Sequence, residues 1–470
     1  MERKKGWKYG SYAVLMTIIA IAVFILIALL LKNVDWKIDM TQNKIYSLSK
    51  QTKDVISSLK EDINVYVFYV KGREDQSVTR LLETYKKSNP RLKIQYIDNL
   101  KNPDKVQKYS EVYLDYENDP TPVSVVFESS KRVKVINHNE MIAASYGLPE
   151  FQGEQKFTNA LRFVALDRVP TIYYIQGHRE AAPSEFAGQL EELRVQNYIV
   201  TPINLLSEKK IPDNADMVLV VSPKSDFMPE EITELNRFLN NGGKGIFFIG
   251  PLNDKQNISK LKDFIKGYGI EVLDNVAIEG NSNGYSQSPA WILPKFQNHK
   301  ITEPIVSANL AMIIPYSRCL KLTNRNGYTV EALLTTSDNS WAKAESSPKT
   351  LVKEKTDLPG PLNLAAVSSK EIKDKAGKSI GNTKLVVVGS SAVCSLSALQ
   401  NPGNYDFFLN IFGWAKGETE DITIRPVPSL YSPLNMNNTQ RVITIICLLI
   451  FVPGAVIVAG VFMWTRRKHL

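Results

Sequence analysis

The sequence contains few cysteines and histidines, the residue types that most often build disulfide frameworks, redox centres and metal sites. Three cysteines in 470 residues do not make a disulfide framework. Cys319 and Cys394 can pair only if the fold brings them together, and Cys447 lies in an apolar run. No C-x-x-C pair is present, which excludes redox chemistry of that kind.

Catalytic motifs are missing as well. No two of the four histidines have metal-ligand spacing on one helix, and no G-x-S-x-G nucleophile elbow occurs. The sequence therefore predicts no metal, no cofactor and no enzymatic activity, although a triad assembled by the fold stays open. No clustered stripe of Lys and Arg is interleaved with aromatic residues, so we expect no nucleic-acid partner.

The glycine-rich segment Gly242-Gly243-Lys244-Gly245 is no phosphate-binding loop. A Walker A loop needs G-x-x-x-x-G-K-[ST] between a strand and a helix. Here the glycines follow a predicted helix and precede a predicted strand, which is typical of a helix C-cap turn. The sequence therefore gives this chain no means of hydrolysing ATP.

Two long uncharged apolar runs lie near the ends, at 12–31 and 442–464. Each has the length of about 20 residues that a membrane-crossing helix needs. The alternatives are a cleaved signal peptide for the first run and a buried core helix for the second. No small-x-small cleavage site follows the first run. The sequence therefore predicts one membrane helix at each end.

Basic residues flank both runs on their outer sides, in the tails 1–11 and 465–470. Each tail carries a charge of +3, which leaves about +3 of the total of +9 for the rest of the chain. The positive-inside rule places both tails in the cytoplasm. We therefore expect a two-pass protein of the plasma (inner) membrane whose central domain lies outside the cytoplasm.

The first part of that central domain, 33–139, predicts a small α/β unit. Strand-like runs at 63–70, 92–97, 123–127 and 132–136 are interrupted by a helical pattern at 79–88. This βαβ…ββ order favours a thioredoxin-like unit, and any other small α/β module is the alternative. A connector at 140–169 follows.

Alternating strands and helices then predict a parallel sheet, covered by helices on both faces, over 170–281 and 382–420. Between these parts, a polar stretch at 282–381 predicts an insertion. A Pro- and Asn-rich tether occupies 421–441. The predicted fold class is α/β: a thioredoxin-like unit and a parallel-sheet domain, flanked by one membrane helix at each end.

The segment Gly177-His178-Arg179-Glu180 directly follows a predicted strand. Ligands of open α/β sheets bind beyond the carboxyl ends of the strands. We therefore predict that Gly177, His178 and Glu180 contact a ligand or partner. The alternative is a tight turn that His178 and Glu180 keep in order.

Trp341 lies in the predicted insertion, directly after the run Thr335-Thr336-Ser337-Asp338-Asn339-Ser340. It is a fourth candidate for binding, as an exposed recognition residue. The alternative is a packing residue that caps a small sheet.

Several segments together resemble the GldG-like auxiliary subunits of gliding-motility-type ABC transport systems. The resemblance covers nearly the whole chain and rests on the order of the segments more than on any one motif. Its carriers are DMTQNKIYSLS at 39–49, Gly153-Glu154 with Phe157-Thr158-Asn159-Ala160, IQGHRE at 175–180, NGGK at 241–244, HKIT at 299–302, TTSDNSW at 335–341, and the last apolar run with Arg466-Arg467.

The resemblance implies a non-catalytic subunit whose partners, a membrane permease and a cytoplasmic ATPase, are encoded separately. It also implies a flavodoxin-like fold similar to glutamine-amidotransferase domains, without their catalytic cysteine. The outer domain would bind or gate cargo, or contact the envelope. Two alternatives stay open: an anchored hydrolase using the crevice near His178, and a structural or adhesive envelope protein.

Overall fold

The computed structural model describes residues 48–417, apart from 146–147, 253–255, 345–349, 374–376 and 378. Both predicted membrane helices, both tails and the tether lie outside the described residues. The longest described helix, α13 (Pro402–Lys416), has 15 residues, which is fewer than the roughly 20 that cross a bilayer. In the described part of the chain, no helix is long and apolar enough to do so.

This finding corrects two predictions. The expected fold class included a membrane helix at each end, and the expected localisation was a two-pass membrane protein. The described chain is instead a mixed α/β structure built on two main sheets, without a membrane-crossing helix. The described helices are short, and those with a marked apolar face pack that face on a sheet or on a neighbouring helix.

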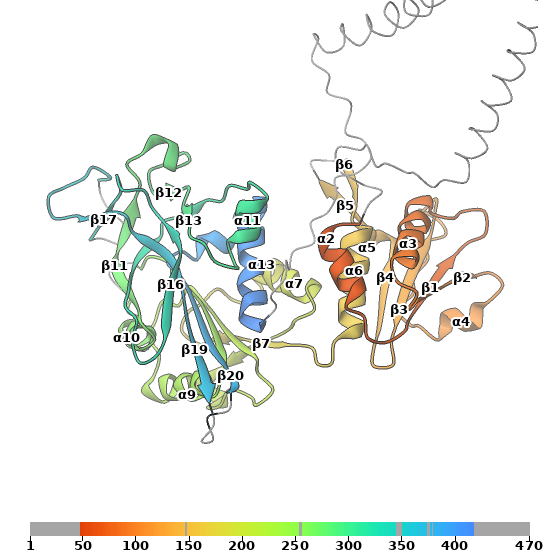
Figure 1. The fold of residues 1–470 in the computed structure, drawn as a ribbon, viewed down its shortest axis with the longest axis horizontal. Coiled ribbons are helices and arrows are strands. Elements are labelled where there is room, and N and C mark those ends of the chain that lie inside the picture. Colours follow the sequence, from red (N-terminus) through yellow and green to blue (C-terminus); the bar gives the residue numbers. More distant parts are fainter. Residues whose placement is uncertain are drawn as a thin grey trace, which may run out of the picture. The chain divides into compact units, whose positions relative to one another are not determined.

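The N-terminal sheet has four strands in the order β2-β1-β3-β4 (Figure 1). β1 pairs in parallel with β2 and antiparallel with β3, and β3 pairs antiparallel with β4. The strands are β1 (Ile63–Tyr69), β2 (Leu92–Asp98), β3 (Val123–Glu128) and β4 (Val133–Asn137). All four lie close to the positions that the alternating apolar pattern predicts.

Three helices, α2 (Lys50–Ser57), α3 (Gln76–Ser88) and α6 (Gly153–Ala165), pack together on one face of this sheet. Ser49 caps α2, since its hydroxyl accepts from the backbone N–H of Thr52. The remaining elements of this part are α4 (Pro103–Gln107), α5 (His138–Met141), β5 (Ile142–Ser145) and β6 (Leu148–Phe151).

The large sheet has twelve strands, five in a parallel part and seven in an antiparallel part. Its parallel part runs β20-β10-β9-β7-β8. These strands are β7 (Thr171–Gln176), β8 (Ile199–Asn204), β9 (Met217–Val221), β10 (Lys244–Phe248) and β20 (Ser379–Val388). The alternating strands and helices of the sequence predict this part.

The antiparallel part corrects the prediction of a purely parallel sheet. β19 runs antiparallel beside β20 and joins β11 and the strands of the polar stretch to the same sheet. These strands are β11 (Ile270–Ile278), β13 (Lys295–Phe296), β15 (Arg318–Leu322), β16 (Thr329–Thr335), β17 (Trp341–Lys343), β18 (Leu358–Pro359) and β19 (Asn363–Lys373). The segment predicted as an insertion therefore extends the sheet.

Helices cover both faces of the large sheet (Figure 1). α7 (Ala187–Val195) and α13 pack on one face, and α9 (Pro229–Asn240) and α10 (Ser259–Gly267) pack on the other. The shorter elements are α8 (Leu205–Glu208), α11 (Glu303–Ser307), α12 (Leu396–Leu399), η1 (Ser282–Gly284), η2 (Ala392–Cys394), β12 (Trp291–Ile292) and β14 (Ile314–Pro315).

Candidate functional site

The loop after β7 holds the predicted residues Gly177, His178 and Glu180. Gly177 has a φ of 120° and Arg179 a φ of 61°, so the backbone turns sharply there. This turn folds the His178 and Glu180 side chains inward, where they are 2% and 0% exposed. The two side chains are therefore buried and not accessible from solvent.

His178 lies between two buried carboxylates. Its Nδ1 is 3.1 Å from Oε1 of Glu180, and its Nε2 is 2.9 Å from Oε2 of Glu231 on α9. Its ring stacks on Phe227 with a centroid distance of 3.6 Å. Its backbone N–H donates to Glu180 Oε2 at 2.7 Å.

Burial alone would lower the pKa of His178, but its hydrogen bonds to Glu180 and Glu231 and the charges of these carboxylates raise it above its usual value. Both ring nitrogens are occupied, so the imidazole has no free atom for a ligand. The geometry favours the alternative in which His178 and Glu180 order the loop. Ligand contact through Gly177, His178 and Glu180 stays a prediction.

Trp341, the fourth predicted residue, opens β17 and is partly exposed. Its side chain packs against the small apolar cluster of Val276, Ile278 and Ala290. Its backbone pairs with Ile278 and Pro359. The structure thus gives Trp341 a packing role next to the edge strand β18, and its role in recognition stays a prediction.

The glycines at 242 and 243 form the predicted C-cap of α9. Gly242 has a φ of 85°, and the N–H of Gly243 donates to the carbonyl of Phe238 at 3.1 Å. This is the geometry in which a helix ends on a left-handed residue. The turn leads straight into β10, so it does not cradle a phosphate.

Replacing Gly242 should therefore cost stability. A Cβ at this position meets no close atom, so the cost of Gly242→Ala comes from the left-handed backbone alone, about 1 kcal/mol. Gly242→Asn should cost less, because Asn tolerates this conformation. Urea unfolding of the two variants checks the order, and equal losses would contradict the C-cap assignment.

His138, at the start of α5, is held in a second histidine–carboxylate cluster. Its Nε2 is 3.1 Å from Oδ2 of Asp75, and its Nδ1 contacts Asp119. Asp75 also caps α3 by accepting from the N–H groups of Ser77 and Val78. The hydrogen bond that His138 makes to Asp75, together with its bond to Asp119, outweighs the effect of burial and raises the pKa of His138.

The His138 cluster makes stability depend on pH. Its raised pKa means that the stabilisation is complete below pH 6.5 and is lost as the pH rises through the folded-state pKa. Burial alone would raise the pKa of Asp75, but the hydrogen bonds that it accepts from His138 and from the α3 amides outweigh burial and lower the pKa. The stabilisation from Asp75 is therefore lost only in acid. In urea unfolding at pH 5.5 and pH 9, His138→Gln should destabilise more at pH 5.5. An equal loss at both values would contradict this.

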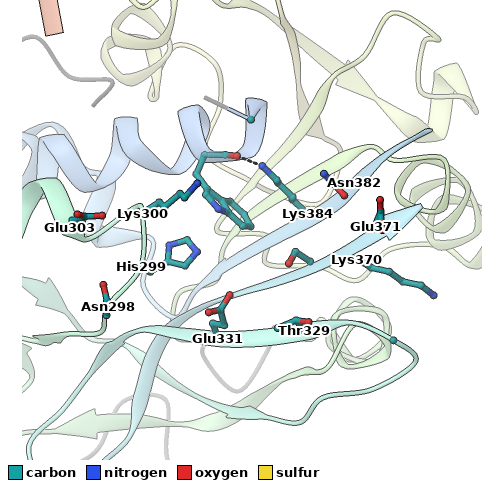
Figure 2. Close-up of a pocket in the computed structure, with 14 residues that line it drawn as sticks. Asn298, His299, Lys300, Glu303, Thr329, Glu331, Lys370, Glu371, Asn382 and Lys384 are labelled. Atoms are coloured by element: carbon teal, nitrogen blue, oxygen red, sulfur yellow. Dashed lines mark hydrogen bonds between the residues drawn. The ribbon is translucent and has the colours of Figure 1, made fainter. Parts of the chain in front are cut away.

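An open pocket of about 600 Å³ lies on the large sheet, between the ends of β16, β19 and β20 and the turn before α11 (Figure 2). Its volume falls within the roughly 300–1,000 Å³ of small-molecule sites. Its lining is mostly polar and carries both signs of charge: Asn298, His299, Lys300, Glu303, Gly327, Thr329, Glu331, Ser369, Lys370, Glu371, Asn382, Lys384, Trp414 and Gly417.

Lys384 and Trp414 form the least exposed wall of the pocket. The ammonium of Lys384 donates to the carbonyl of Trp414 in the last turn of α13 and lies 4.6 Å from the centre of its indole (Figure 2). Burial, followed by the charges of Lys244 and Lys300, lowers the pKa of Lys384 to about 8.

His299 stands next to this wall, with its ring 5.2 Å from the indole of Trp414. Burial and the nearby charges of Lys384 and Lys300 lower the pKa of His299 to about 4, so it is neutral at pH 7. Its Nδ1 accepts from the N–H of Ile301 at 3.1 Å. The proton of the neutral ring is therefore on Nε2, which makes Nε2 a donor.

Sequence reasoning did not single out the pocket residues, although one signal was present. The strands β10 and β20 bring a lysine to the start of their apolar runs, in KGIFF and KLVVV. Such a pair of positions predicts two lysines side by side if the strands are neighbours. Nothing in the sequence predicts that β10 and β20, with more than a hundred residues between them, pair in this register.

Both described cysteines are free and buried. Cys319 lies in β15 and Cys394 in η2, and they are not bonded to each other. Burial raises the pKa of each thiol to about 12, so neither is a thiolate at neutral pH. The described chain is thus held by its core, without a disulfide.

The comparison with known families decides the class of protein. The family described as "ABC-type uncharacterized transport system" matches residues 169–411, which hold the whole large sheet. The chain belongs to this family. A domain of unknown function (DUF7088) matches residues 42–142, which include the N-terminal sheet. The family covers auxiliary components of ABC transport, and the narrower GldG-like resemblance remains a prediction.

Individual relatives add little to the family assignment. An uncharacterized protein of Borreliella burgdorferi is 22% identical over 92% of this chain and 94% of its own length. Among solved structures, the mmIFT52 N-terminal domain is 16% identical over 54% of this chain and all of that one, at a TM-score of 0.38. A Thermotoga maritima glutamine amidotransferase is 11% identical over 54% of this chain and 94% of its own, at a TM-score of 0.25. Likeness this low supports no argument about fold or function.

Proposed function

We propose that this protein is a non-catalytic auxiliary component of an ABC transporter and that its pocket binds the transported molecule or one that gates transport. Membership of an ABC transport family carries the proposal. The matched residues 169–411 contain most of the pocket lining, from Asn298 to Lys384. The narrower GldG-like assignment is part of this proposal.

The proposed partners are a permease and an ATPase encoded separately. ATP hydrolysis would come from the partner, because the one Gly-Gly-Lys segment of this chain forms a helix C-cap. The described residues also contain no group of three or more His, Cys, Asp or Glu side chains that could hold a metal ion. The chain would act by binding.

An ATPase assay tests the non-catalytic part of this proposal. The purified full-length chain should hydrolyse ATP no faster than the buffer, and Lys244→Met should not change that. Addition of the chain to its co-expressed permease and ATPase should change their rate of hydrolysis. Turnover by the chain alone that disappears in Lys244→Met would refute the proposal.

A further inference from the structure

Two lysines lie directly beside each other across the large sheet. Lys244 of β10 and Lys384 of β20 are register partners on adjacent parallel strands, so their side chains leave the same face. Like charges in such positions repel each other. Among the described residues, Lys384 has a carbonyl and an indole as partners and no carboxylate. Lys300 adds a third positive charge nearby.

Unneutralised acids line the same pocket. Glu331 projects from β16, and Glu303 opens α11. Within the described chain, no hydrogen bond or ion pair joins either of them to Lys300 or Lys384. In Figure 2, Lys300 and Lys384 lie in the upper part of the pocket and Glu331 in the lower part, with His299 between them. Glu303 is drawn in the upper part as well, so the separation of charge concerns Glu331 and the two lysines.

We propose that this pocket binds a small zwitterion, with its anionic group at Lys384 and Lys300 and its amine at Glu331. A purely anionic ligand would be repelled by the Glu331 carboxylate, and a purely cationic ligand would be repelled by the two lysines. A ligand carrying both charges neutralises both walls. Nε2–H of His299 can donate to the anionic group, and the Trp414 indole provides an apolar side. This inference rests on the proposed function, because it names the class of molecule that the pocket would take.

Such a ligand could be a short peptide with free ends or an amine that carries a phosphate. Calorimetric titration of the full-length chain should use triglycine and O-phosphoethanolamine as the two zwitterions. N-acetyl-triglycine lacks the amine, and triglycinamide lacks the carboxylate. At least one zwitterion should bind about tenfold or more tightly than either capped peptide, since each lost charged contact has about that effect. The better zwitterion tells the two sources apart.

Two variants place the binding in this pocket. Glu331→Gln changes an exposed residue, so folding should be unaffected. It should weaken the binding of the zwitterion about 10- to 100-fold and leave the binding of N-acetyl-triglycine unchanged. Lys384→Met should weaken both. Glu208→Gln and Lys321→Met are matched controls on exposed residues away from the pocket, and they should change nothing.

Three results would overturn the inference: no binding of either zwitterion, equal or tighter binding of a capped peptide, or zwitterion binding that Glu331→Gln leaves intact. None of these results touches the transporter assignment, which rests on the family match and is tested by the partners that the chain recruits. Conversely, the chain could bind a zwitterion as predicted and yet recruit no ABC permease or ATPase in cells. That result would contradict the proposed function and leave the zwitterion site supported.

Discussion

His178→Ala should lower the free energy of unfolding by about 3–5 kcal/mol, the cost of removing one partner from a buried ionic cluster. The substitution leaves Glu180 and Glu231, which are 0% and 3% exposed, as buried carboxylates without their cation. It also removes the ring that stacks on Phe227. Urea unfolding followed by circular dichroism measures the loss.

A neighbouring residue and a double substitution provide the controls. Arg179→Ala changes an exposed side chain in the same turn and should shift stability by no more than about 0.5 kcal/mol. Adding Glu180→Gln to His178→Ala should recover part of the loss, because it removes one of the two orphaned charges. A loss below about 1 kcal/mol for His178→Ala would show that the cluster does not order this loop.

Arg318→Met should have the second-largest effect, about 3 kcal/mol. The guanidinium is 2% exposed and donates to the carbonyls of Gly250 and Leu273 at 3.1 and 3.0 Å and to Asp274 at 2.6 Å. Methionine fills similar space but donates nothing, so two carbonyls near the sheet lose their partner. The same urea assay measures the change.

Asp274→Asn is the matched control, because it disturbs the same ion pair from its exposed side. The Asp274 side chain is 71% exposed, so its charge is well screened and its removal should cost less than about 1 kcal/mol. Similar small losses in both variants would mean that Arg318 does not anchor the backbone of β11 and the segment after β10.

Local patterns in the sequence predict the individual elements better than their assembly. The apolar run of β9 and the glycine stop after α9 are visible in the sequence, since each depends on neighbouring residues. The two-residue strands β12, β13, β14 and β18 are not, because so short a segment shows no period. β13 and β18 pair with strands of the large sheet, whereas β12 and β14 pair with each other in a separate two-stranded sheet.

The candidate sites show the same limit. The spacing of His178 and Glu180 predicts their contact in a turn, but Glu231, which closes the cluster, comes from α9. The position of His178 after a strand made it the predicted binding residue. The fold buries it, and the pocket lies instead at the ends of β16, β19 and β20, beside Lys384. Lysine pairs across strands depend on register, which one sequence does not reveal.

The two histidine–carboxylate clusters and the pocket differ in how far their charges are neutralised. In the clusters, each histidine has a carboxylate at both ring nitrogens. In the pocket, Lys384 and Glu331 remain apart within the described chain. Clusters whose charges are neutralised internally stabilise loops, whereas separated charges in an open pocket can be neutralised by a ligand. This contrast is why we assign ligand binding to the pocket and not to the His178 loop.

The most direct test of the account is affinity purification of the tagged full-length chain from its native cells, with quantitative mass spectrometry of the proteins that accompany it. The account predicts that an ABC permease and an ABC ATPase co-purify in fixed ratio. Glu331→Gln, which changes only the pocket, should leave that ratio unchanged. A chain that purifies alone under several extraction conditions, with permease and ATPase no more abundant than in an untagged control, would contradict it.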